Sequence, residues 1–153
     1  MALGLRTHVC FAWLGFSASW TPTDVGWNNM GVFMRCLSGG LMLADYSAIA
    51  GQISAALTLL VFSLVHVVRG PPVYESNVTI VWALLLLGVA AVLCIAALWR
   101  TEIDNVAVMV IGYMFVANAL GTLSWIATVP FLASSFDGSV VSSFYAGSGL
   151  GSL

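Results

Sequence analysis

The chain contains no lysine and few charged residues of any kind. Of its 153 residues, 7% are charged and 61% are hydrophobic, whereas soluble domains are typically about 25% charged. A water-exposed globule of this composition would lack the polar surface that keeps a protein dissolved. The four arginines are scattered along the chain, so no basic cluster is present for nucleic-acid phosphates. The composition excludes a soluble enzyme and a nucleic-acid-binding protein, and it predicts an integral membrane protein.

Three stretches without charged side chains are long enough to cross a bilayer. They cover residues 46–68, 77–99 and 106–130, and a helix needs about 20 apolar residues to cross a hydrocarbon core of about 30 Å. The second stretch is followed by Arg100 after Trp99, a pair typical of the membrane interface. The third contains Pro130, where we expect the regular helix to end or kink.

The N-terminal segment has two interpretations as a membrane element. Residues 3–20 are mostly apolar, but the stretch is shorter than the other three. We expect it to form a short membrane helix, and the alternative is a helix that lies in the membrane interface. Arg6 and the small residues near Ser19 are also typical of a signal peptide. The predicted fold is therefore an all-α integral membrane protein, a bundle of four transmembrane helices, or three if the first segment does not cross.

The predicted bundle forms one domain over residues 1–136. Its first connection, residues 21–45, is long, and the later connections are short. Residues 137–153 are rich in Gly and Ser, and we expect a C-terminal tail that is disordered unless a partner or a lipid surface holds it. Small residues four positions apart favour close helix packing, and the sequence does not tell whether the partner helix belongs to this chain. These pairs are Ala50 with Ser54, Gly51 with Ala55, and Ala117 with Gly121.

Polar side chains inside the predicted spans are the candidate binding residues. Gln52 and Asn118 lie in apolar helices, where an unpaired amide is costly and seeks a partner in another helix or in a lipid, quinone or pigment headgroup. His66 lies near the end of a span, where an imidazole can ligate haem or a pigment or can donate to a backbone carbonyl. These three residues are the predicted cofactor-binding candidates, and no cofactor is required by the sequence.

Catalytic and metal-binding patterns are missing from the sequence. Two histidines and three dispersed cysteines match no metal-site spacing, and no nucleophile is paired with a base. The carboxylates fall outside the predicted spans, so a proton relay or ion pathway has no carrier at mid-membrane depth. We therefore expect neither an enzyme nor a transporter acting alone.

Part of the sequence resembles the four-span claudin and amastin families. The order of short helix, longer loop and three further helices is similar to both. Thr21-Pro22-Thr23-Asp24 resembles a Thr-Pro-x-Asp sequence that often follows the first amastin helix, and residues 31–36 are similar to the Gly-Leu-Trp-x-x-Cys motif of claudins. The chain departs from the claudin pattern in having Phe33 at the tryptophan position, no second cysteine and a shorter loop. The resemblance implies a self-standing surface protein.

The leading functional hypothesis is a non-catalytic accessory subunit of a larger membrane protein complex. Its partners would be other integral membrane subunits and lipids rather than nucleic acid, and the chain would not function as an isolated monomer. We favour an energy-transducing organelle membrane, of the mitochondrial inner or thylakoid type, over the plasma membrane. The alternatives are the claudin-like surface protein and a pigment- or haem-binding subunit using His66, Gln52 or Asn118.

Overall fold

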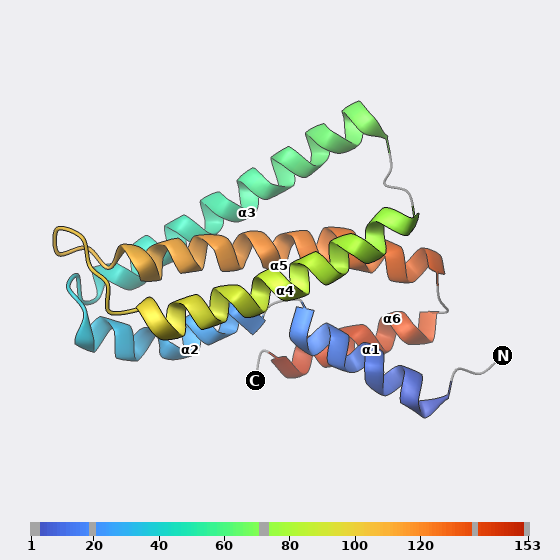
Figure 1. The fold of residues 1–153 in the computed structure, drawn as a ribbon, viewed down its shortest axis with the longest axis horizontal. Coiled ribbons are helices and arrows are strands. Elements are labelled where there is room, and N and C mark those ends of the chain that lie inside the picture. The colour runs from blue at the N-terminus through green and yellow to red at the C-terminus, as the bar shows by residue number, and fades with distance from the viewer. Residues whose placement is uncertain (1–3, 19–20, 71–73, 136–137, 152–153) are drawn as a thin grey trace.

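The computed structural model describes residues 4–18, 21–70, 74–135 and 138–151, and within these ranges the chain is mostly helical and has no strand (Figure 1). This confirms the all-α prediction. The six helices of these ranges are α1 (Leu5–Ala18), α2 (Thr21–Cys36), α3 (Met42–Arg69), α4 (Tyr74–Leu98), α5 (Val108–Ser135) and α6 (Gly138–Gly151).

Three helices are long and apolar enough to cross a membrane. The qualifying segments are Met42–Arg69 in α3, Thr79–Leu98 in α4 and Val108–Pro130 in α5. They correspond to the predicted spans 46–68, 77–99 and 106–130, which supports the membrane-protein class. Pro130 does not end the third helix, because α5 continues through it to Ser135.

The first predicted span is a shorter helix than expected. α1 has 14 residues, which extend about 21 Å, so a fourth long helix is not found in the described ranges. Instead α1 and α2 follow one another in the same direction along the long helices (Figure 1). A Cβ added at Gly88, in the middle of α4, would lie 3.5 Å from Cγ of Pro22. The start of α2 is therefore level with the middle of α4.

The predicted first connection, residues 21–45, is mostly helical in the structure. Pro22 in the first turn, Asp24 near the N-terminus and Arg35 in the last turn all favour a helix there. Its apolar positions recur at helical spacing, which the sequence analysis did not use. The buried residues of α2 are Pro22, Thr23, Gly26, Met30 and Phe33.

The predicted C-terminal tail also differs from the structure, because residues 138–151 form α6, which packs most extensively on α1. The two helices run in the same direction and cross (Figure 1). A Cβ at Gly147 would overlap the carbonyl of Ala12, and one at Gly15 would overlap the carbonyl of Phe144. Glycine is thus needed in both helices where they cross. The surface on which residues 138–151 are ordered is supplied by α1 of the same chain.

α5 is the central helix of the bundle and contacts α2, α3, α4 and α6. Val110, Met114 and Ala117 on its first half are fully buried and form one cluster with Met30 and Phe33 of α2. On the second half of α5, Leu132 packs with residues of α6 in another cluster. α2, α3, α4 and α6 therefore pack around α5, and its buried side chains lie in these contacts.

The turns at one end of the bundle are joined by a side chain. Glu102, between α4 and α5, accepts hydrogen bonds from the Ser38 N–H (2.5 Å) and the Ser38 hydroxyl (2.8 Å), between α2 and α3. These two bonds stabilise the charged form and lower the pKa of the Glu102 carboxyl. The α2–α3 and α4–α5 turns are therefore held together outside the spanning segments.

We predict that Gly147→Ala destabilises the protein by about 1–3 kcal/mol, because the new methyl group would force α6 away from α1. Unfolding of the detergent-solubilised chain, followed by circular dichroism, measures this change. Gly138→Ala is the matched control, since a Cβ at Gly138 has no neighbour within 4 Å. Equal stability of the two variants would contradict the close crossing.

We predict that the Ser38–Glu102 link is lost in acid. Because the folded-state pKa of Glu102 is below its ordinary value, the link contributes its full stability above the ordinary pKa and loses it as pH falls through the lowered one. Melting temperatures of the native chain and of Glu102→Gln, measured from neutral pH to about 3, should therefore converge at the acid end. A difference that stays constant over this range would show that the carboxylate is not involved.

Candidate functional site

A face of small side chains on α3 brings this helix against α5. Ser47, Gly51 and Ser54 are buried at spacings of four and three residues, which places them on one side of the helix. The Ser54 hydroxyl donates to the backbone carbonyl of Phe115 (2.5 Å). The helix that packs against the small residues around Gly51 is therefore α5 of this same chain.

Asn118, one of the three candidate residues, lies inside this contact. A Cβ at Gly51 would lie 2.7 Å from Nδ2 of Asn118, so the amide occupies the space that glycine leaves. Nδ2 donates to the backbone carbonyl of Met114 (2.8 Å), and the Thr122 hydroxyl donates to the backbone carbonyl of Asn118 (2.8 Å). These contacts favour a packing role for Asn118.

Gln52, the second candidate residue, is next to Gly51 in the sequence but lies outside the contact between α3 and α5. Its side chain is exposed on the outside of the bundle. Within the described part of the chain, it makes no hydrogen bond. In hydrocarbon, an amide placed this way has a partner only if another helix, a lipid headgroup or the backbone of its own helix supplies one.

His66, the third candidate residue, is exposed near the end of α3 and stacks on Phe62, with 6.3 Å between ring centroids. It lies 14 residues from Gln52, which is about 21 Å along the helix. The structure therefore does not bring His66, Gln52 and Asn118 together into one site. Their predicted role in binding a cofactor stays a prediction.

A groove separates α3 from α5 beyond the small-residue contact. After Ser54, the face of α3 toward α5 carries bulky side chains, and the two helices diverge in Figure 1. The groove has a volume of about 360 Å³. We call it the α3–α5 groove; it is lined by Ser54, Leu57, Thr58, Val61, Phe62 and Val65 of α3 and by Phe115 and Leu123 of α5.

Polar groups at the start of α2 are the functional candidates that the sequence analysis missed. Thr23 Oγ1 and Asp24 Oδ2 are buried and have no hydrogen-bond partner, although Pro22 beside them is level with the middle of α4. Asp24 therefore lies near the middle of α4, a helix long enough to cross a membrane, and the expectation that no carboxylate lies at mid-membrane depth stays a prediction. The Thr-Pro-x-Asp sequence could have indicated a helix start here, but its depth in the bundle depends on tertiary packing.

A hydrogen bond joins the start of α2 to α5. The buried Tyr113 hydroxyl donates to the Pro22 carbonyl. A Cβ at Gly26 would lie 3.0 Å from the Tyr113 ring and would overlap the sulfur of Met114. The absence of a side chain at Gly26 lets α2 approach α5 closely enough for this bond.

Further buried polar atoms without a partner lie on the second half of α5. They are Ser124 Oγ, Trp125 Nε1 and Thr128 Oγ1. Trp125 also packs against Tyr145 of α6, with ring centroids 5.1 Å apart. Among the described residues, no three His, Cys, Asp or Glu side chains are grouped as metal ligands would be, and Cys10, Cys36 and Cys94 are unpaired and exposed.

Comparisons of the chain with models of protein families, with curated proteins and with solved structures find no match.

We predict that Tyr113→Phe destabilises the chain by about 0.5–1.5 kcal/mol, the usual contribution of one hydrogen bond. The Pro22 carbonyl would lose its donor while the packing of the ring is retained. Tyr46→Phe is the matched control, because Tyr46 is exposed at the start of α3. Denaturant titration of both variants in detergent measures the difference, and equal midpoints would contradict the attachment of α2 through Tyr113.

Proposed function

We propose that this chain is a non-catalytic accessory subunit of a larger membrane protein complex, held there by the outer face of α3. The observation that carries the proposal is Gln52, an exposed amide without an internal partner on a membrane-spanning helix. Hydrocarbon offers such a group no hydrogen bond, whereas a polar side chain or carbonyl of a neighbouring helix does.

The spacing of exposed residues on α3 supports a helical partner. One set of them follows alternating intervals of three and four, as in the heptad repeats by which helices pack side by side. The residues at positions 46, 53, 60 and 67 have larger side chains. Of the three residues between them in this set, two are small, Ala56 and Ser63, and small side chains permit close approach of a partner helix. We define the outer face of α3 as the exposed residues Tyr46, Ile49, Ile53, Ala56, Leu60, Ser63 and Val67. Gln52 lies one turn before Ala56 and borders this face.

The arrangement outside the spanning helices also supports an accessory role. Between the helices at the Glu102 end, residues 37–41 and 99–107 form short turns, and Glu102 is already engaged by Ser38. α2, in the region that the claudin-like hypothesis treats as an exposed loop, is packed on α5. Most of the surface available for recognition is therefore the apolar side of the helices.

The proposal includes an energy-transducing organelle membrane, mitochondrial or photosynthetic, as the location of the complex. Fractionation of cells that produce the tagged chain tests this location. Labelling of a cysteine introduced at Asn29, which is exposed on α2, tests the surface-protein alternative in intact cells. An absorption spectrum of the purified assembly tests the pigment- or haem-binding alternative that uses His66.

We predict that Ala56→Trp releases the chain from its complex, because a bulky ring in the outer face of α3 would keep a partner helix at a distance. Blue-native electrophoresis of mildly solubilised membranes should show the native chain in a large assembly and the variant as a smaller species. Ala90→Trp, at an exposed alanine in the middle of α4, is the control and should leave the assembly intact. Migration of the native chain as a free monomer would refute the proposal.

A further inference from the structure

The α3–α5 groove is a candidate binding site on a different face of α3 from the proposed subunit contact. Its lining is apolar apart from Ser54 and Thr58, and the Ser54 hydroxyl is already bonded to Phe115. Leu57, Val61 and Val65 are about half exposed, so the groove opens to the surroundings of the bundle. A ligand with a hydrocarbon portion fits such a lining.

The length of the groove suits one acyl chain. From Ser54 to Val65, α3 rises about 16 Å, about half of the roughly 30 Å hydrocarbon core of a bilayer. One acyl chain of a lipid covers one leaflet, which is this same depth. A hydrocarbon chain lying along α3 would therefore contact the whole apolar lining.

Basic and hydrogen-bonding groups lie where the apolar lining ends. Arg69 follows Val65 by four residues and Phe62 by seven, so it continues the groove face about 6 Å beyond Val65. His66 flanks this face and stacks on Phe62, a lining residue. Arg69 is exposed, and among the described side chains no carboxylate pairs with it.

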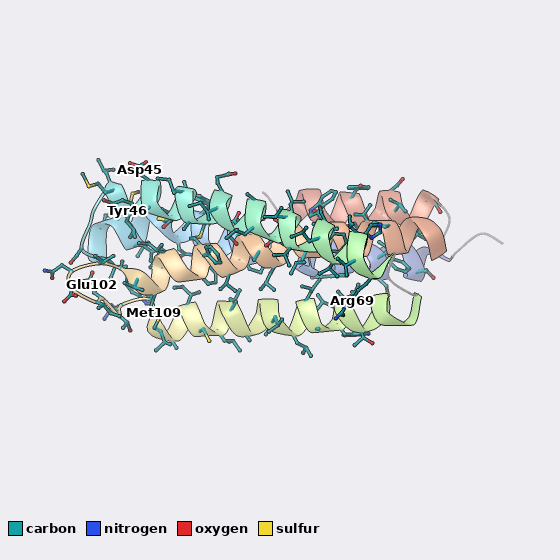
Figure 2. The ribbon with its side chains drawn as sticks, turned by 90° about the horizontal axis from the view of Figure 1, so that it is seen from above. Asp45, Tyr46, Arg69, Glu102 and Met109 are labelled. Atoms are coloured by element: carbon teal, nitrogen blue, oxygen red, sulfur yellow. The ribbon has the colours of Figure 1, made fainter. Side chains whose placement is uncertain are left out.

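The charged groups distinguish the two ends of α3. Figure 2 shows Arg69 at the opposite end of the bundle from Asp45 and Glu102. A positive group just beyond an apolar groove on a membrane-spanning helix attracts an amphiphile whose charged headgroup is negative. Along α3, the apolar groove comes first and the imidazole and guanidinium follow. In a membrane lipid, the acyl chain is likewise followed by the phosphate, so the groove corresponds to the acyl chain and the two polar groups to the phosphate.

We propose that the α3–α5 groove binds an anionic phospholipid, with one acyl chain between α3 and α5 and the phosphate at Arg69 and His66. The acyl chain covers Val61, Phe62 and Val65. The guanidinium and imidazole donate hydrogen bonds to phosphate oxygens, which Arg matches well through its planar geometry. This site is independent of the outer face of α3, and the proposed function does not require it.

The test uses the full chain reconstituted in bilayers of equal parts phosphatidylglycerol and phosphatidylcholine, followed by native mass spectrometry of retained lipids. We expect the native chain to retain phosphatidylglycerol preferentially. Val61→Trp should abolish retention by filling the groove. Its control is Val89→Trp on α4, because Val61 and Val89 are exposed to nearly the same extent, 58% and 59%.

Arg69→Gln tests the headgroup separately from the groove. It should lower the enrichment of phosphatidylglycerol over phosphatidylcholine about fivefold, the equivalent of about 1 kcal/mol for one basic residue at a membrane surface. Arg35→Gln, at another exposed arginine on α2, should leave the enrichment unchanged. Melting temperatures of all variants identify any that have lost their fold, and Arg69→Gln still tests the site if Val61→Trp does not fold.

Three outcomes would overturn the lipid site. The first is equal retention of both lipids by the native chain, and the second is equal retention by Val61→Trp and Val89→Trp. The third is a change in oligomeric state rather than lipid content on Val61→Trp, which would assign the groove to a helix of a second copy. Loss of the complex in blue-native gels on Ala56→Trp would leave this test unaffected, so the two proposals fail separately.

Discussion

The close approach of α3 to α5 is the contact on which the arrangement of the bundle depends. It requires small side chains at Ser47, Gly51 and Ser54, because Asn118 occupies the space beside Gly51 and the Ser54 hydroxyl reaches the Phe115 carbonyl. In a bilayer, hydrophobic exclusion does not drive helices together, so such close packing and interhelical hydrogen bonds must do so. Where the small residues end, the helices diverge, and the α3–α5 groove is the direct result.

The three long helices could be predicted from the sequence, because a bilayer requires about 20 apolar residues for a crossing and little else in the chain is that apolar. The small residue at Gly51 was also recognised as a packing position. The sequence could not identify α5 as its partner, since pairing depends on which faces meet in three dimensions. The polarity of His66, Gln52 and Asn118 marks them as candidates, and the distance between Gln52 and His66 follows from their spacing on one helix. Which of the three side chains faces another helix depends on tertiary packing, which the sequence does not contain.

The largest differences between expectation and structure concern α2 and α6, for which the sequence predicts a loop and a tail. Glycine and serine indicated disorder at residues 137–153, yet Gly147 and Gly15 allow α6 and α1 to meet backbone to backbone. The same residue types favour a flexible chain in water and close packing between helices in a membrane. The position of Asp24 along the bundle also depends on tertiary packing, because the contacts of Pro22 with Gly88 and Tyr113 determine where the Thr-Pro-x-Asp sequence lies.

The turn held by Ser38 and Glu102 has a mechanical consequence for α3. Its first half is fixed both by that clamp and by the contact of Gly51 with Asn118, whereas its last turns, up to Arg69, have exposed side chains. The supported part of α3 is thus its first half, and the part that forms one wall of the groove is its less supported second half. The width of the groove therefore depends on the few contacts that hold the Arg69 end of α3.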